Sequence, residues 1–199
     1  MGTTANGRFD DNWPLFEKML GYFRYFKIKK YIKSEKKPVC VDIGCGFNGR
    51  FLHSIASQID TGYGFDLRAN DVVHENIHII NNSKFNGNLP LESGTVDRVF
   101  LLAVIEHLEQ DNGLITEASR VLKPGGLLII TTPTPAAKPV LEFLSYKLHI
   151  ISRESIEEHK HYYTKQELID CLAKGNCACH KYQKFQCGFN EMIIGRKEA

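Results

Sequence analysis

The clearest chemistry in this sequence lies in a glycine-rich turn and in a carboxylate some distance beyond it. Gly44, Gly46 and Gly49 follow the apolar run Val39–Ile43. Glycine lets the backbone approach a ligand closely, and the helix after such a turn directs free N–H groups at an anion. Asp66 ends a second apolar run 22 residues beyond Gly44, about where a ribose diol needs an acceptor. The two segments predict a site for a nucleotide-type cofactor.

Asp42 indicates which kind of cofactor this is. The glycine spacing alone also satisfies the dinucleotide pattern used for nicotinamide and flavin cofactors. Asp42 stands two residues before Gly44, where its charge would repel a pyrophosphate but could bind the ammonium of a methionine-like group. The sequence therefore favours a cofactor with a cationic amino-acid end, and a nicotinamide enzyme is the more distant alternative.

Short apolar runs alternate with helix-compatible stretches along the chain. The expected strands are Val39–Ile43, Gly62–Phe65, Ile77–Ile80, Val96–Leu102 and Leu127–Thr132. Asp111–Leu122 has helical apolar spacing, and a capping box at Thr164–Glu167 opens a helix that should end at Gly175. Cys179–Cys187 and Asn190–Arg196 predict a closing antiparallel hairpin. This alternation predicts an α/β fold with a doubly wound, mostly parallel sheet.

Two further segments complete a family signature. Val96–Leu108 reads VDRVFLLAVIEHL, and Arg120–Pro133 reads RVLKPGGLLIITTP. Together with the glycine-rich turn and Asp66, they resemble the class I S-adenosylmethionine (SAM)-dependent methyltransferases, specifically the small single-domain type 11 and type 12 kind. The resemblance is dense over residues 38–133. It implies a Rossmann-like, mostly parallel seven-stranded sheet with a C-terminal antiparallel hairpin.

The resemblance also implies SAM as cofactor, S-adenosylhomocysteine as product, and a set of cofactor contacts. Gly44, Cys45 and Gly46 would pass under the methionine portion. Asp66 would bind the ribose hydroxyls, and Ala103 would present its backbone beside the sulfonium. The full set of expected cofactor-binding residues is Arg24, Asp42, Gly44, Cys45, Gly46, Asp66, Leu67, Phe85, Asn86 and Ala103.

Two positions depart from the family pattern. Asn48 stands where the family usually has glycine, although asparagine tolerates a left-handed backbone, so the turn can survive. Lys84 stands where relatives often carry an adenine-binding aspartate, and Phe85 or Asn86 would have to replace it. These departures leave open a second class of function, a SAM-binding or partner subunit without catalysis.

A methyltransferase that acts on a hydroxyl needs a general base as well as alignment of the acceptor. Glu106 and His107 follow the strand Val96–Leu102, at the edge of a parallel sheet where ligands bind. His161 lies before the capped helix, and the pKa of imidazole suits a base. We predict His161 as the base, helped by Glu106 or His107. The structural alternative has His107 packed on the sheet and His161 anchoring a surface loop.

A metal-assisted variant is the first alternative. Glu106, His107 and a later His-x-His at residues 159–161 are similar to the metal-binding set of the small-RNA 2′-O-methyltransferases. That family has a further glutamate where this chain has Ala103, so one ligand is missing. A similar Glu-His pair occurs in relatives that resemble ubiquinone-pathway O-methyltransferases. We therefore expect no metal, and RNA 2′-O-methylation with a divalent ion remains an alternative.

Composition sets the outer limits. A chain of 199 residues with 43% hydrophobic and 24% charged residues is ordinary for one globular domain. No apolar run approaches the roughly 20 residues of a membrane helix, and the N-terminus lacks a signal pattern, so we expect a cytoplasmic protein. Irregularly placed cysteines suit a reducing compartment. The paired spacing of a zinc site is missing from Cys171, Cys177, Cys179, His180 and Cys187.

We divide the single domain, residues 1–199, into four parts. Residues 1–37 form a basic and aromatic helical arm, 38–132 the SAM-binding core, 133–163 a lid over the substrate, and 164–199 the last helix and hairpin. Residues 1–38 carry nine Lys and Arg against four Asp and Glu. We expect the arm to dock its aromatic face on the core. Contact with an anionic partner, including a peripheral membrane contact, is the alternative.

The lid should select the acceptor. Thr134–Ala137 is a turn-rich exit from a strand, and Val140–Ile151 is apolar and aromatic enough for a short helix that covers the site. Its aromatic content suits a small organic or sugar acceptor, and nothing signals a nucleic-acid module. The prediction is a SAM-dependent methyltransferase that modifies a small molecule or glycan at oxygen, with its oligomeric state left open.

Overall fold

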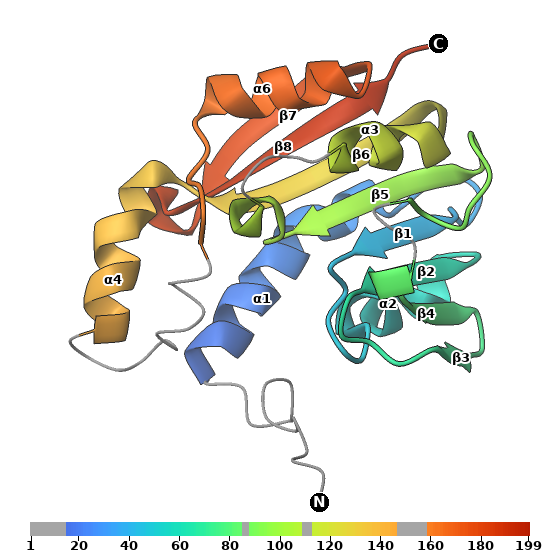
Figure 1. The fold of residues 1–199 in the computed structure, drawn as a ribbon, viewed down its shortest axis with the longest axis horizontal. Coiled ribbons are helices and arrows are strands. Elements are labelled where there is room, and N and C mark those ends of the chain that lie inside the picture. Colours follow the sequence, from blue (N-terminus) through green and yellow to red (C-terminus); the bar gives the residue numbers. More distant parts are fainter. Residues whose placement is uncertain (1–14, 85–87, 109–112, 147–158) are drawn as a thin grey trace, which may run out of the picture.

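The apolar runs form the strands of one sheet. The structure is a computed structural model, and it describes residues 15–84, 88–108, 113–146 and 159–199. Its strands are β1 (Cys40–Ile43), β2 (Gly62–Asp66), β3 (Val72–His74), β4 (Ile77–Asn81), β5 (Val96–Leu102), β6 (Leu122–Pro133), β7 (Cys177–Phe185) and β8 (Asn190–Lys197). Their order across the sheet is β3-β4-β2-β1-β5-β6-β8-β7 (Figure 1).

The strand directions confirm the predicted fold class. From β4 through β2, β1 and β5 to β6, every neighbouring pair is parallel. The last two strands of the chain add antiparallel pairs, β8 on β6 and β7 on β8. This is a Rossmann-like, mostly parallel sheet with a C-terminal antiparallel hairpin. In such a sheet the carboxyl ends of β1, β2 and β5 meet at one edge, and Gly44, Asp66 and Ala103 lie at these ends.

The number of strands differs from the seven that we expected, because the described residues form eight. The additional strand is β3, which pairs antiparallel with β4 at the edge of the sheet. All three of its residues are exposed, so they carry no alternation of buried and exposed positions for a sequence pattern to detect. Strand β6 also begins earlier than Leu127, since Leu122 pairs with Val96 ahead of a shift in register.

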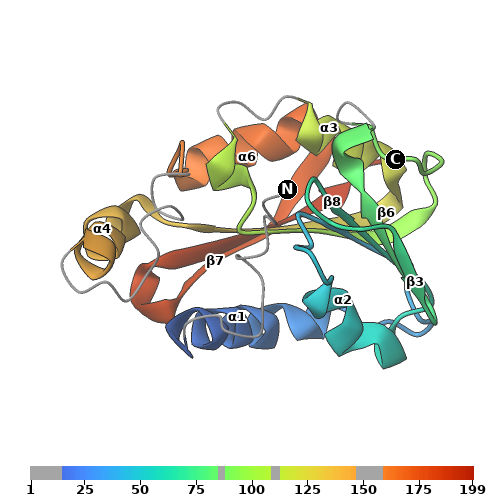
Figure 2. The ribbon, with the colours of Figure 1, turned by 60° about the horizontal axis from the view of Figure 1, so that its bottom comes forward.

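Helices cover both faces of the sheet. They are α1 (Leu15–Ile28), α2 (Arg50–Ile55), α3 (Leu114–Val121), α4 (Lys138–Tyr146) and α6 (Lys165–Lys174). Helices α3 and α6 pack on one face, and α1 and α2 on the other (Figure 2). Successive strand residues therefore enter different cores: Ile130 packs with α3 and α6, whereas Ile129 packs with α1 and α2.

Local signals place the C-terminal elements correctly. The Thr164 hydroxyl accepts a hydrogen bond from the Glu167 N–H, and the Glu167 carboxylate accepts one from the Thr164 N–H. This capping box begins α6, and Gly175 ends it as predicted. Strands β7 and β8 form the predicted hairpin. The predicted helix Asp111–Leu122 is present as α3, although residues 109–112 lie outside the described part of the chain.

Helix α1 of the N-terminal arm and helix α4 of the predicted lid flank the carboxyl edge of the sheet (Figure 1). Ile28 of α1 and Ile32 beyond it are fully buried, so the arm docks on the core. The expectation that its aromatic face makes this contact is wrong for Tyr22, Phe23 and Phe26, which are exposed. Helix α4 follows β6 and extends away from the sheet (Figure 1). Residues 147–158 of the predicted lid are outside the described ranges. Within those ranges, every helix is too short or too polar to cross a membrane.

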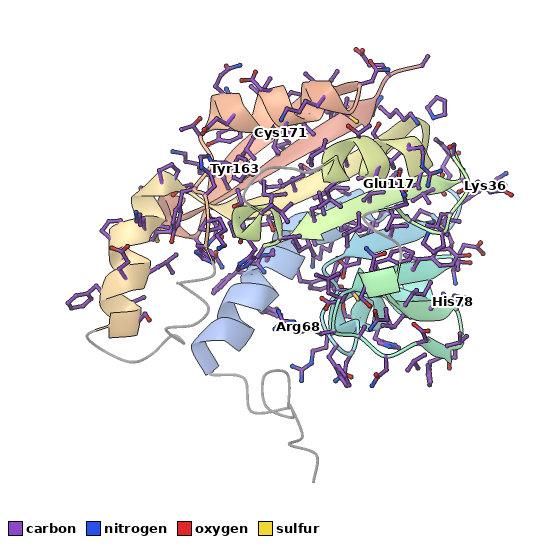
Figure 3. The ribbon with its side chains drawn as sticks, viewed as in Figure 1. Lys36, Arg68, His78, Glu117, Tyr163 and Cys171 are labelled. Carbon is purple, nitrogen blue, oxygen red and sulfur yellow. The ribbon has the colours of Figure 1, made fainter. Side chains whose placement is uncertain are left out.

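An ion pair on α3 holds the segment that leads into β5. Glu117 accepts a hydrogen bond from the Leu89 N–H at 2.6 Å and binds the Arg120 guanidinium at 2.7 Å (Figure 3). Arg120 also donates to the carbonyls of Leu89 and Leu91 and to the Ser93 hydroxyl. The hydrogen bonds from Arg120 hold the pKa of the Glu117 carboxyl below its usual value. The arginine of the RVLKPGG segment is thus a structural residue.

We expect Glu117→Gln to lower the free energy of unfolding by about 2 kcal/mol at neutral pH, because the charge-assisted bonds of Arg120 are lost. Since folding lowers the pKa of this carboxyl from 4.5, the difference from wild type should be complete above that pH and vanish as the pH falls through the folded pKa. Urea unfolding at several pH values measures it. The exposed Glu92→Gln is the control, and equal losses in both variants would contradict this role.

Candidate functional site

The glycine-rich turn is closed onto the end of β2. The N–H groups of Gly44 and Cys45 donate to the Phe65 carbonyl at 2.7 and 3.2 Å. Gly44 has φ +77°, and a Cβ on it would lie 2.4 Å from a methyl carbon of Val104. Glycine is therefore required at this position for two reasons, backbone conformation and close packing. The contact also joins the turn to the loop after β5.

Asn48, the departure from the family pattern, does not disturb this turn. It is not among the described residues with positive φ. The left-handed residue is Gly49, with φ +55°, and it precedes the first residue of α2. A Cβ on Gly49 would lie 2.2 Å from Ile79, so glycine is needed here as well. The turn survives because its left-handed positions are all glycines.

Asp66 is the carboxylate that the turn meets. Its Oδ2 accepts the Gly46 N–H at 3.0 Å, and its Oδ1 accepts the Arg68 N–H at 2.9 Å. A carboxylate oxygen has two lone pairs, so each oxygen can accept one more hydrogen bond. The carboxylate is therefore fixed in orientation and still able to receive two hydroxyl groups. Leu67, which was also expected at the cofactor, has an exposed side chain.

Arg24, Asp42 and Glu106 form a charge cluster beside the turn, in which both carboxylates are buried and Arg24 is half-buried. Asp42 is 2% exposed, and its Oδ1 has no hydrogen-bond partner among the described residues. Burial raises the pKa of the Asp42 carboxyl to about 8, the Asp66 charge adds to the rise, and Arg24 opposes it. Burial likewise lowers the pKa of Arg24, against the charges of Glu106 and Asp42. Its Nε is buried without a partner in the described part of the chain.

This cluster can receive a group that carries both charges. An unpaired guanidinium nitrogen offers a donor to a carboxylate, and an unpaired carboxylate oxygen offers an acceptor to an ammonium. Leaving such groups buried and unpaired is costly. The arrangement of Arg24 and Asp42 therefore fits the zwitterionic end of an amino acid, whose ammonium was the group expected at Asp42.

Ala103 has a strained backbone at the end of β5. Its φ is +59°, although it is not glycine, and its N–H donates to the Thr131 carbonyl at 2.9 Å. Non-glycine residues in this region cost roughly 1–3 kcal/mol and cluster at functional sites. The next residue, Val104, packs on Gly44. Ala103 thus lies beside the glycine turn, and its expected position beside the sulfonium stays a prediction.

Glu106, three residues after Ala103, has a buried side chain. It is 1% exposed, and its carboxylate accepts a hydrogen bond from the Thr132 hydroxyl at 3.1 Å. Burial raises its pKa. Its backbone carbonyl accepts the N–H groups of Lys160 and His161 at 2.7 and 3.2 Å. These two bonds bring residues 159–163 to the loop after β5.

The three histidines near this loop, His107, His159 and His161, separate into two groups. The rings of His107 and His159 lie 5.0 Å apart, and His159 Nδ1 is 3.0 Å from the Tyr162 hydroxyl. His161 instead places Nε2 at 3.1 Å from the Glu167 carboxylate, at the start of α6. The structure thus brings Glu106 and His107 together with His159. The sequence pointed to His159 only as part of the His-x-His in the metal-assisted alternative, and it gave no signal for Tyr162 or Thr132.

The first group also has the geometry of a metal-ligand set. One ligand atom each from Glu106, His107 and His159 lies within 4.8 Å of the others. Carboxylate oxygen and imidazole nitrogen are ligands for several divalent ions. Ala103 contributes no ligand atom to this set. Phe85 and Asn86, the expected adenine contacts, lie outside the described residues.

Comparisons with known proteins indicate a methyltransferase domain. The profile of the methyltransferase domain family matches residues 41–130. A probable S-adenosylmethionine-dependent methyltransferase from Mycolicibacterium smegmatis is 31% identical over 98 residues, 47% of this chain and 37% of that protein. Norajmaline N-methyltransferase from Rauvolfia serpentina is 30% identical over 115 residues, 50% of this chain and 38% of that protein. The matches thus span little more than a third of these relatives.

Solved structures agree on the fold. An S-adenosylmethionine-dependent methyltransferase from Mesorhizobium loti superposes with a TM-score of 0.65. The match covers 86% of this chain and 96% of that one, at 14% sequence identity. The superposition establishes the shared architecture. A sequence identity this low says nothing about the acceptor.

The raised pKa of Asp42 predicts an unusual pH dependence of stability. Folding raises the pKa of this carboxyl from 3.8 to about 8, so the folded state binds more protons in that interval and loses stability as the pH rises. Asp42→Asn removes this loss. We expect the variant to exceed wild type in free energy of unfolding by about 2 kcal/mol or more at pH 8, and by little near pH 4. Urea titrations test this, with the exposed Asp60→Asn as control. A gain independent of pH would show that Asp42 is not the group responsible.

Proposed function

We propose that this chain, whose residues 41–130 match the methyltransferase domain family, is a class I S-adenosylmethionine-dependent methyltransferase. It binds SAM at the carboxyl edge of its sheet and methylates a small molecule or glycan at oxygen. The acceptor oxygen attacks the methyl carbon of the sulfonium in line, the carbon–sulfur bond breaks, and S-adenosylhomocysteine leaves with the electron pair. A base takes the proton of the acceptor hydroxyl. The protein has mainly to align the reactants and to hold that base.

The observation that carries this proposal is that Arg24 Nε and Asp42 Oδ1 are buried without a hydrogen-bond partner among the described residues. The methionine end of SAM is a zwitterion whose carboxylate suits Arg24 and whose ammonium suits Asp42. A nicotinamide dinucleotide has a pyrophosphate near this turn instead, and the Asp42 charge would repel it. Asp66, with one free acceptor position on each oxygen, suits the two ribose hydroxyls. Ala103 and the glycine turn would then lie beside the sulfonium.

For the proton we propose the group formed by Glu106, His107 and His159. Glu106 is buried with a raised pKa, and His107 follows it at the same edge of the sheet as the glycine turn. His161, the base expected from the sequence, remains the alternative proposal, since its Nε2 lies beside the Glu167 carboxylate. The N-methyltransferase among the relatives makes nitrogen the alternative methylated atom.

Two other functions compete with this one. Metal-assisted methylation of an RNA ribose is supported by the ligand geometry of Glu106, His107 and His159. A SAM-binding or partner subunit without catalysis would use the same cofactor contacts and lack an acceptor. Both alternatives retain SAM binding, so the cofactor and the acceptor chemistry need separate tests.

The cofactor assignment can be tested with ligands that share an adenosine and differ in whether they carry the amino-acid end. Methylthioadenosine keeps the adenosine of SAM and lacks its amino and carboxyl groups. We expect Arg24→Met to weaken SAM and S-adenosylhomocysteine by at least about tenfold, which corresponds to a lost charge-assisted bond, and to leave methylthioadenosine unchanged. Asp66→Ala should weaken all three ligands, because all three carry the ribose. Isothermal titration calorimetry measures the affinities.

The matched control is Asp60→Ala, an exposed carboxylate on the strand connection before β2. It should change no affinity, and NADH should not bind to any of the proteins. If Arg24→Met weakened methylthioadenosine as much as SAM, Arg24 would not contact the amino-acid end. Absence of SAM binding in wild type would remove the methyltransferase proposal altogether.

The metal question can be answered without knowing the acceptor. We expect no Mn²⁺ binding tighter than millimolar in wild type, because Ala103 leaves the possible ligand set one donor short. Manganese titration followed by electron paramagnetic resonance measures this. The comparison variants are Glu106→Gln and, outside the set, Glu167→Gln. Micromolar binding that is lost in Glu106→Gln and kept in Glu167→Gln would favour the metal-assisted alternative.

A further inference from the structure

Helix α1 presents aromatic rings to solvent as well as to the core. Tyr22, Phe23 and Phe26 are 64%, 47% and 53% exposed. On the opposite side of the same helix, Ile28 is fully buried and Tyr25 packs against the core. The helix therefore docks through one side, and the described residues leave its second, aromatic side exposed. Large exposed apolar side chains in adjacent helical positions indicate an interaction surface.

Lysines border these rings. A helical repeat of 3.6 residues places Lys29 and Lys30 on the same side of the segment as Tyr22 and Phe26, one turn further along. Lys29 Nζ lies 4.3 Å from the centre of the Phe26 ring. Lys27 adjoins Phe23 and Phe26 on this side as well. We call the six residues Tyr22, Phe23, Phe26, Lys27, Lys29 and Lys30 the outer face of the arm.

The charge of this segment has one sign. Residues 21–38 contain seven Lys and Arg, and Glu35 is their only acidic residue. Arg24 is turned inward to Asp42 and Glu106, so the cations on the outer face are all lysines. Lys36, labelled in Figure 3, lies at the far end of the sheet and does not belong to the face. Figure 2 shows α1 on the outside of the sheet, opposite α3 and α6.

We propose that the outer face of the arm binds an anionic lipid surface, with the helix lying in the plane of the membrane. Aromatic side chains enter the boundary between headgroups and acyl chains, while lysines extend their ammonium groups to anionic headgroups. The convex shape of a helix suits a flat surface. A single-stranded nucleic acid is instead held in a groove, often by arginine stacking, and the outer face has neither feature. A protein partner would need acidic groups placed opposite the lysines, whereas an anionic membrane carries negative charge over its whole surface.

This position has a consequence for the candidate site. Arg24 and the outer face belong to the same turns of α1, so a docked helix would hold the site within about one helix diameter, roughly 10–12 Å, of the lipid. The site would then face acceptors that are carried by a membrane, a consequence that rests on the proposed function. The docking itself does not depend on that function.

The test is co-sedimentation of the full chain with vesicles of phosphatidylcholine, with and without phosphatidylglycerol. We expect binding to the anionic vesicles that weakens in high salt. The double variants Phe23→Ser/Phe26→Ser and Lys29→Glu/Lys30→Glu should each bind at least about tenfold more weakly. Val73→Ser removes an apolar side chain on β3 that is more exposed than either phenylalanine, at 68%. Lys181→Glu/Lys184→Glu reverses the charge of two lysines on β7. Both controls should bind as wild type does.

Binding of S-adenosylhomocysteine in solution separates the two proposals, because it should be the same in wild type and in all four variants. Its retention in the outer-face variants also shows that they are folded. Failure of wild type to sediment with anionic vesicles would overturn the membrane proposal and leave the methyltransferase proposal standing. Equal binding by wild type and the outer-face variants would overturn it too, as would retention on single-stranded RNA in place of vesicles.

Discussion

The site depends on one electrostatic constraint, the enclosure of Asp42 at the end of β1 within reach of the charges of Asp66 and Arg24. Burial disfavours the ionised carboxylate and the protonated guanidinium alike, so each needs a partner. The backbone beside Asp42 is shaped by two further residues, because glycine at position 44 accommodates Val104 and Ala103 has a left-handed conformation. The folded protein is therefore destabilised at this place, and binding of an external zwitterion would restore the lost stability.

Elements whose signals are local could be predicted from the sequence. The buried parallel strands read as apolar runs, and the capping box at Thr164 needs only neighbours along the chain. Elements defined by long-range pairing could not. Strand β3 exists because Val72–His74 lies alongside β4, with no buried side chain of its own. The early start of β6 likewise follows from the pairing of Leu122 with Val96.

The residues of the candidate site also divide into those that the sequence could place and those that it could not. Gly44 and Asp66 could be placed because the order of strands and turns fixes which residues meet at the carboxyl edge. Arg24 required the family resemblance, since nothing near it in sequence marks its inward direction. The ring that would join His107 could not be chosen, because His159 and His161 are similar in sequence context. That choice depends on the bonds from residues 160 and 161 to the Glu106 carbonyl, which only the folded chain forms.

The hydrogen bond between the Gly46 N–H and Asp66 bears on how fast a ligand can bind. It holds the glycine turn and the carboxylate together before any ligand is present, so this part of the site needs no ordering of loops on association. A recognition surface that is rigid in advance keeps the entropic cost of binding small. Differences in affinity among ligands that share this adenosine end would then appear in their residence times, with similar rates of arrival for all of them.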